Sequence, residues 1–142
     1  MIEISNEIIS GIKSHAEETY PEECCGILLG KFDAFQKVVF EILRIENSKE
    51  TERNRRYLIK PQDYLKAEKY AKEKGYDIVG FYHSHPNHPA KPSEYDKEHA
   101  FPFLSYIIVS VENGKSIEVN SWVLKEDRSE FDLEEIRIKN KI

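Results

Sequence analysis

The sequence predicts an α/β (α+β) fold, with a central, curved, mixed sheet flanked by helices, as a single domain over residues 1–142. Three observations lead to this fold class. Residues 57–82 follow a strand–helix–strand pattern, which is typical of α/β units. Residues 106–111 form an apolar run, which indicates a central strand. The Asn-Gly pair at 113–114 is the strongest hairpin signal in the chain.

The N-terminal part predicts one helix and two strands. Apolar residues recur at helical spacing over residues 5–19, and Ser5 can cap the start of that helix. A short strand is expected over 26–30, followed by a turn over 31–35. A second strand over 38–45 would then pair with the first or lie near it in one sheet.

The middle of the chain is a polar loop followed by a strand and a helix. Residues 46–56 lack periodicity and form either a solvated connection or a flap that holds substrate. Residues 57–59 predict a short strand. Pro61 favours a helix start, and Gly75 favours its end, so a helix is expected over 62–74.

The C-terminal part predicts further strands around a short helix. Residues 77–82 form a buried strand, and 94–100 a short helix. After the hairpin, alternation over 117–124 indicates another strand. Residues 131–138 mix apolar and charged side chains, which suggests an edge strand.

Composition limits the classes of partner. The 142 residues carry a net charge of −5, whereas a protein that mainly binds nucleic acid needs a basic surface. No apolar run approaches the roughly 18 residues of a membrane span, and no signal peptide opens the chain. We therefore expect a cytoplasmic protein with neither nucleic acid nor membrane as its partner.

The two cysteines, Cys24 and Cys25, are adjacent and cannot form a relaxed disulfide. They also lack the spacing of a zinc ribbon. We interpret them as small buried hydrophobic residues, one of which could face a functional pocket.

The strand over 77–82 runs into a His-x-His pair. His83 and His85 are two residues apart, so both imidazoles point to one side of an extended backbone and can bind a metal together. Asp96 can swing back as a carboxylate ligand. The alternative is that the histidines form a polar strand face and that Ser93 and Asp96 are a helix capping box; capping is also compatible with metal binding.

Three other polar residues are interpreted as structural residues or surface residues. His15 is expected on the surface or in a satisfied core position, and His99 on the surface or beside the ligands. Ser84 points away from the two histidines, which favours a structural role.

This pattern resembles the signature of the JAMM (MPN-plus) metalloproteases. The chain has their His-Ser-His-Pro motif, followed by a serine and an aspartate, and their upstream Pro-x-Glu-x-Cys-Gly segment before an apolar strand. It is most similar to the small stand-alone bacterial and archaeal members. The signature positions are Glu23, His83, His85, Ser93 and Asp96.

The resemblance implies a cytidine-deaminase-like MPN core and a zinc metallopeptidase. One Zn²⁺ would be bound by His83, His85 and Asp96, with water as the fourth ligand. Glu23 would be the general base, with Glu22 an exposed neighbour, and Ser93 would donate a hydrogen bond to the developing oxyanion. The implied substrate is a ubiquitin-like or sulfur-carrier protein, cut at an amide or isopeptide bond after its Gly-Gly tail.

The alternative from another class is a catalytically silent scaffold of the same fold. Silent relatives usually lack one of the signature residues, and all are present here. Other zinc hydrolases are excluded by their motifs. The chain has no His-Glu-x-x-His helix and no Pro-Cys-x-x-Cys of zinc deaminases, and it is too short for an amidohydrolase barrel of about 250 residues.

Overall fold

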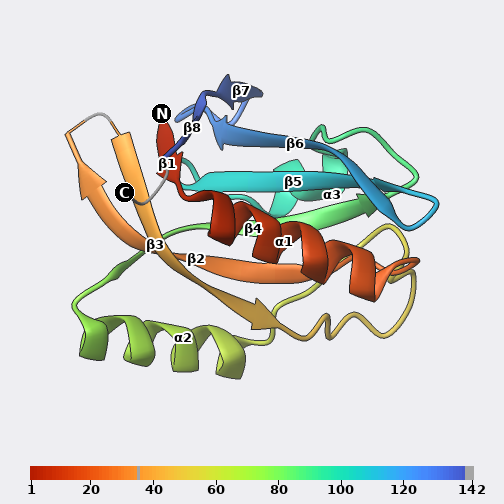
Figure 1. The fold of residues 1–142 in the computed structure, drawn as a ribbon, viewed down its shortest axis with the longest axis horizontal. Coiled ribbons are helices and arrows are strands. Elements are labelled where there is room, and N and C mark those ends of the chain that lie inside the picture. Colours follow the sequence, from red (N-terminus) through yellow and green to blue (C-terminus); the bar gives the residue numbers. More distant parts are fainter. Residues whose placement is uncertain (35, 140–142) are drawn as a thin grey trace.

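The computed structural model describes residues 1–34 and 36–139. Within them, eight strands form one mixed sheet in the order β7-β6-β5-β4-β2-β3-β1-β8 (Figure 1). The strands are β1 (Ile2–Ile4), β2 (Cys25–Asp33), β3 (Gln36–Ile45), β4 (Asp77–Pro86), β5 (Ser105–Glu112), β6 (Lys115–Leu124), β7 (Phe131–Glu134) and β8 (Ile136–Ile138). The helices are α1 (Asn6–Thr19), α2 (Pro61–Lys74) and α3 (Glu94–His99).

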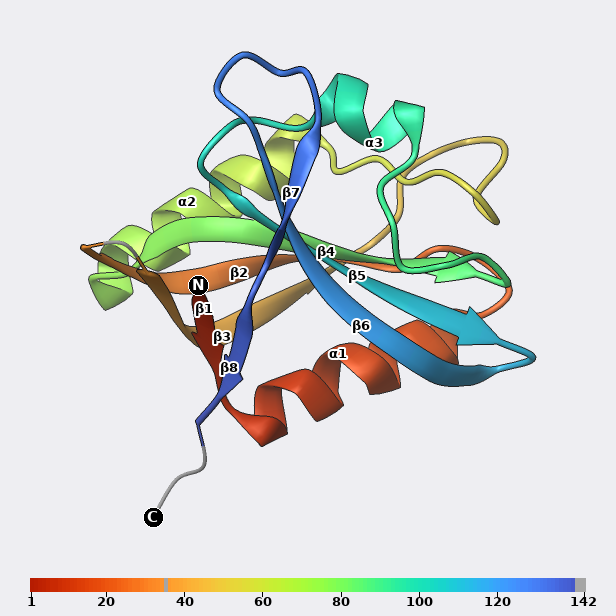
Figure 2. The ribbon, with the colours of Figure 1, turned by 90° about the horizontal axis from the view of Figure 1, so that it is seen from above.

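The helices cover both faces of the sheet. Figure 2 shows α1 on one side and α2 with α3 on the other. Helix α1 buries Ile9, Ile12 and Ala16 against one apolar cluster, and α2 buries Ala67 and Ala71 against a second. Each buried isoleucine contributes about 1.5–3 kcal/mol to the free energy of unfolding. The mixed sheet flanked by helices confirms the predicted fold class.

Strand β4 lies in the middle of the sheet and ends at the candidate site. It pairs antiparallel with β2 and parallel with β5. Gly80 allows this close pairing, because a Cβ atom there would lie 2.0 Å from the main-chain oxygen of Ser105. The carboxyl end of β4 is thus held by two neighbours, which gives its side chains defined directions.

The two edges of the sheet are joined by one short segment. Strand β7 pairs with β6 at one edge, whereas β8 pairs with β1 at the other. Only Glu135 separates them, and its oxygen accepts a hydrogen bond from Ile2 N over 2.9 Å. The predicted edge position of residues 131–138 is confirmed, but the segment forms two short strands at opposite edges instead of one strand. The sheet curls enough for this segment to pair with both edges (Figure 2).

Glu134, the last residue of β7, has a buried carboxylate. Glu134 Oε2 accepts a hydrogen bond from Lys37 Nζ over 3.0 Å. Its Oε1 accepts hydrogen bonds from Ser105 and Ser121 over 2.6 Å and 2.7 Å. Burial alone would raise the pKa of Glu134, but these donors and the lysine charge hold that pKa below its ordinary value.

Most predicted elements are confirmed, with small shifts of their ends. Helix α2 begins at Pro61, and Gly75 ends it in the left-handed conformation. The Asn113–Gly114 hairpin has positive φ at both residues, as a type I′ turn requires. No helix in the described parts of the chain has the length and apolar character needed to span a membrane.

The predicted turn over 31–35 lies too early. Residues 31–33 continue the antiparallel ladder of β2 with β3, and the chain reverses near Ala34, whose φ is 51°. Phe35 lies outside the described residues. Strand β1 was not predicted; its three residues are too few for a periodic pattern.

The predicted strand over 57–59 is also wrong. Its main-chain groups bond mainly to side chains. Leu58 N donates to Asn47 Oδ1 over 3.1 Å, and Tyr57 O accepts from Tyr95 Oη over 3.2 Å. Leu58 O also accepts from a main-chain group, Ser48 N, over 2.9 Å. Side chains satisfy the other groups named here, so no strand ladder forms.

Candidate metal centre

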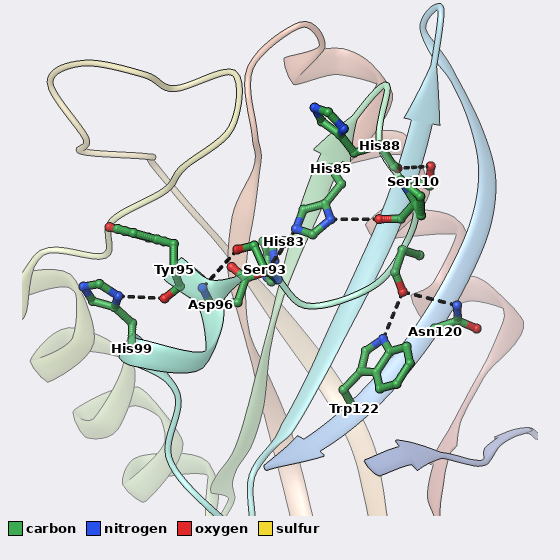
Figure 3. A network of polar contacts seen from close by, with 12 residues as sticks. His83, His85, His88, Ser93, Tyr95, Asp96, His99, Ser110, Asn120 and Trp122 are labelled. Carbon is green, nitrogen blue, oxygen red and sulfur yellow. Dashed lines mark hydrogen bonds and ion pairs between the residues drawn. The ribbon is translucent and has the colours of Figure 1, made fainter. Parts of the chain in front are cut away.

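Three ligand-type atoms meet beside the carboxyl end of β4 (Figure 3). Nε2 of His83 lies 3.2 Å from Nε2 of His85, and Asp96 Oδ2 lies 3.3 Å and 3.1 Å from these two atoms. All three side chains are buried. Neighbouring ligands of a tetrahedral zinc ion, with bonds of about 2.0–2.1 Å, are about 3.3 Å apart. The triangle therefore has the size of one face of such a site.

The start of helix α3 aims Asp96 at the histidines. Ser93 Oγ accepts a hydrogen bond from Asp96 N over 3.1 Å, and Asp96 Oδ2 accepts one from Ser93 N over 2.8 Å. This is a complete capping box. The sequence left open whether Asp96 only caps the helix or also approaches the histidines. In the structure Asp96 does both.

His85 has its tautomer set by the chain that follows it. Its Nδ1 lies 2.9 Å from the main-chain oxygen of Pro89, which can only accept a hydrogen bond. Nδ1 is therefore the protonated nitrogen in the neutral ring. Nε2 then directs a lone pair into the triangle, as a metal ligand must.

The loop between β4 and α3 is held in place by β5 and β6. Ser110 Oγ donates to the oxygen of His88 over 2.5 Å. Trp122 Nε1 and Asn120 Nδ2 donate to the oxygen of Ala90 over 2.9 Å and 3.3 Å (Figure 3). These contacts hold the residues on either side of Pro89, whose carbonyl orients His85, from positions far away in the sequence.

His83 is enclosed by aromatic and apolar groups. The Tyr57 ring stacks on its imidazole with a centroid distance of 4.6 Å. Its Nδ1 has no hydrogen-bond partner among the described residues. Burial lowers the pKa of His83, which favours the neutral ring. A neutral buried imidazole is the form that binds a metal.

The charges in the triangle favour a bound cation. Burial alone would raise the pKa of Asp96, but His83 and His85 together hold it well below its usual range. The pKa of His85 is raised, because its contacts with Asp96 outweigh the effect of burial. The charge of Asp96 therefore favours a positive charge beside the imidazoles, which a proton or a metal ion can supply. Two imidazoles and a carboxylate form a donor set that fits zinc.

Glu23 lies close to the triangle from the other side. One of its carboxylate oxygens is within 4.8 Å of ligand atoms of His83 and His85. Its Oε1 is buried and has no hydrogen-bond partner among the described residues. Burial, with the charge of Asp96 adding and His85 opposing, raises the pKa of Glu23 to about 8. A carboxyl group of this kind can exchange a proton near neutral pH.

Asn47 connects Glu23 to the loop over 46–56, and the sequence did not single it out. Its Nδ2 donates to the oxygens of Glu23 and Arg56 over 3.1 Å and 3.0 Å. Its Oδ1 accepts from Lys49 N and Leu58 N over 3.0 Å and 3.1 Å. The side chain is buried and uses all of these groups. No pattern in its polar segment singles out Asn47, because three of its four partners, in Glu23, Arg56 and Leu58, lie nine or more residues away.

The same loop is also fastened to α3 through Tyr95. The Arg56 guanidinium lies 5.0 Å from the centre of the Tyr95 ring, within cation–π range. His99 stacks on the same ring, with the two ring centroids 4.1 Å apart, and is exposed. His99 therefore lies on the surface, which was one of its two interpretations.

The cysteines and Ser84 occupy the positions expected of structural residues. Ser84 Oγ accepts a hydrogen bond from Cys24 N over 2.8 Å. Both cysteines are free and buried. Cys25 pairs directly with His83 across the β2–β4 ladder, so these two side chains share a face. Cys25 is thus the cysteine on the side of the candidate site.

His15 and Glu22 also follow their interpretations. His15 Nδ1 lies 2.8 Å from Tyr82 Oη, and burial lowers the pKa of His15 to about 4. It is a satisfied, half-buried residue. Glu22 is exposed, and its Oε1 lies 3.9 Å from Nη1 of Arg53.

Fold and site together define a mixed-sheet domain with a candidate mononuclear metal centre at the end of a central strand. Residues 5–125 match the family described as prokaryotic homologs of the JAB domain. The chain belongs to this family, of the JAMM type.

Known proteins agree with this assignment. The chain is 33% identical over 106 residues to a desampylase of Haloferax volcanii, which covers 74% of each chain. A solution structure of a Desulfitobacterium hafniense protein superposes with a TM-score of 0.87 at 33% identity, covering 100% of this chain and 95% of that one. A JAB1/MPN domain protein of Archaeoglobus fulgidus, at 20% identity, has the same fold, with a TM-score of 0.62 over 98% and 97% of the two chains.

Proposed function

We propose that this protein is a zinc-dependent metallopeptidase that hydrolyses amide or isopeptide bonds. The observation that carries the proposal is the buried triangle of His83, His85 and Asp96, with sides of 3.1–3.3 Å. The lone pairs of three such groups repel one another at these distances unless a proton or a cation lies between them. The distances suit zinc, and we assign these three residues as its ligands.

Zinc in such a centre supplies a Lewis acid that polarises the scissile carbonyl and activates water. Glu23 is the group placed to take up a proton and deliver it to the leaving amine. Burial keeps its proton affinity high, whereas a nearby divalent cation would favour the carboxylate. These opposing effects bring the Glu23 pKa into the range of a general base and acid.

Ser93 is the proposed donor to the developing oxyanion. Its Oγ accepts the hydrogen bond from Asp96 N, so its own hydroxyl proton is not used in that bond. Ser93 also lines the cavity that reaches Glu23 and His85. A donor fixed by a helix cap meets the requirement for preorganised stabilisation of charge.

The proposed substrate is a ubiquitin-like or sulfur-carrier protein, cut after a Gly-Gly tail. The support is the family membership and the name of the desampylase relative. Glycine also suits a buried centre, because its backbone can approach closely without a side chain.

The test is hydrolysis of ubiquitin extended beyond its Gly-Gly terminus, followed by intact mass. The zinc-loaded protein should cleave after the second glycine, and His85→Ala should contain about one zinc ion less per chain and leave the substrate intact. Replacing the second glycine of the substrate by valine should slow cleavage strongly, because of its branched side chain. Equal zinc content in both proteins would contradict the ligand assignment.

A further inference from the structure

The cavity that Ser93 lines has a volume of about 400 Å³ and opens onto the candidate site beside the end of β4 and the loop that follows it. It shares Tyr95 with a larger apolar cavity of about 540 Å³. The smaller cavity includes Glu23, His85 and Ser93 in its lining, so whatever it holds lies beside the reacting groups. Its remaining lining residues are Arg55, Arg56, His88, Pro89, Lys91, Glu94 and Tyr95.

Cations outnumber acids among the side chains of this smaller cavity. Arg55, Arg56 and Lys91 line it together with two acids, the buried Glu23 and the exposed Glu94. We call it the cationic cavity. Glu52, outside the lining, forms ion pairs with both arginines. Lys91 forms no ion pair or hydrogen bond through its ammonium group within the described residues. This local excess of positive charge stands in a chain with a net charge of −5.

Both rims of this cavity are held in place before any ligand binds. Arg56 lies on the Tyr95 ring, and its main-chain oxygen accepts from buried Asn47. Lys91 follows Ala90, whose oxygen is held by Trp122. Because the backbone of both rims is already fixed, binding an anion has to order only side chains, which lowers its entropic cost.

We propose that this cavity binds a carboxylate of the substrate on the leaving-amine side of the scissile bond, because Glu23, the proposed proton donor to the leaving amine, lines it. The inference rests on the proposed function and specifies its substrate. Arginine and lysine provide charge-assisted hydrogen bonds to carboxylates. In a peptide substrate the carboxylate can come from two sources, the free C-terminus of a single released amino acid or an acidic side chain.

The test uses ubiquitin extended beyond Gly-Gly by one residue, in two matched pairs. The first pair is alanine with a free carboxylate against alaninamide. The second is aspartic acid amide against asparagine amide. We expect kcat/KM to be about tenfold higher for a carboxylate probe than for its matched amide, the size of a charge-assisted hydrogen bond. A preference in the first pair alone identifies the C-terminus as the source, and in the second pair alone the side chain.

Variants distinguish the cavity from the metal as the source of the preference. In Lys91→Ala and Arg55→Ala the ratio between matched probes should fall toward one. In the control variant Lys66→Ala, an exposed lysine on α2, the ratio should stay as in the wild type. A preference that survives in the first two variants would show that the metal alone attracts the carboxylate and would overturn the proposal.

Binding measurements keep this inference separate from the proposed function. Isothermal titration of the same four probes into zinc-loaded Glu23→Gln should give a dissociation constant about tenfold lower for the carboxylate forms. Equal affinity, or no binding of any probe, would also overturn the proposal. Absence of hydrolysis with the wild type, when carboxylate probes still bind more tightly, would instead refute the proposed reaction.

Discussion

The amide of Asn47 donates a hydrogen bond to the main-chain oxygen of Glu23 over 3.1 Å. The same nitrogen, Asn47 Nδ2, also donates to the main-chain oxygen of Arg56. The amide oxygen of Asn47 accepts hydrogen bonds from Lys49 N and Leu58 N. One buried side chain therefore couples the position of the proposed base to the wall of the cationic cavity. Asn47 is a positioning residue in this arrangement, since it acts through Glu23 and the loop.

Asn47→Asp should keep the acceptor and lose both donors. We expect a loss of about 1–3 kcal/mol in the free energy of unfolding, because two buried carbonyls lose their partner. If Asn47 positions Glu23, kcat should fall while zinc content stays unchanged, in contrast to a ligand variant. Chemical denaturation, metal analysis and kinetics on the same samples check this. Asn54→Ala, at an exposed position of the same loop, is the control that should change none of the three.

Glu23→Gln should retain both fold and zinc but lose about two to four orders of magnitude in turnover, because the amide cannot take up a proton. The measurement is hydrolysis of the extended ubiquitin under single-turnover conditions. Glu22→Gln, its exposed neighbour, should retain activity. Near-normal turnover in Glu23→Gln would assign the proton transfer to another group.

Zinc should stabilise the folded protein through the triangle. A ligand that binds only the native state at about one hundred times its dissociation constant adds about 2.7 kcal/mol. Thermal unfolding with zinc and with a chelator should therefore differ in the wild type. The difference should disappear in Asp96→Asn, and it should persist in His99→Ala, whose side chain is exposed. A persisting shift in Asp96→Asn would place the metal elsewhere.

The Glu134 cluster predicts a pH dependence of stability. The pKa of Glu134 in the folded protein is below its ordinary value of 4.5, so the folded state binds fewer protons there than the unfolded state. Its contribution is complete above about pH 5 and is lost as the pH falls through 4.5 and below. Glu134→Gln should be less stable than the wild type at pH 7, by about 2 kcal/mol.

The difference between Glu134→Gln and the wild type should be smaller at pH 3.5, because this pH lies below the ordinary pKa of 4.5 and the unfolded wild type then binds a proton more readily than the folded state does. Urea denaturation at both pH values measures this. Glu135→Gln, next to it and exposed, should follow the wild type at both. If the free energies of unfolding of Glu134→Gln and the wild type differ equally at pH 7 and pH 3.5, the charge of Glu134 does not stabilise the fold.

Local patterns were sufficient where the deciding forces are local. Helical spacing and the caps Ser5 and Gly75 predicted α1 and α2, because helices bond within themselves. The Asn113–Gly114 turn predicted the β5–β6 hairpin through its φ requirements alone. Strand periodicity placed His83 and His85 on one face. Their role as zinc ligands stays a proposal until metal is measured.

Tertiary structure decided what depends on distant partners. Residues 57–59 have the composition of a strand, yet Asn47 and Tyr95 take their hydrogen bonds, so no ladder forms. Residues 131–138 are divided between two edges only because the sheet curls until those edges come near one segment.

The candidate site also combines features that the sequence determines with features that only the tertiary structure decides. The sequence by itself determined the donor types of the triangle and the directions of His83 and His85, through the two-residue period of a strand. Only the folded chain brings Glu23, which precedes β2, to within 4.8 Å of the histidines and buries its carboxyl group. Burial and distance are properties of packing between β2, β4 and the loops around them. A pKa set by burial therefore cannot be derived from the order of residues along the chain.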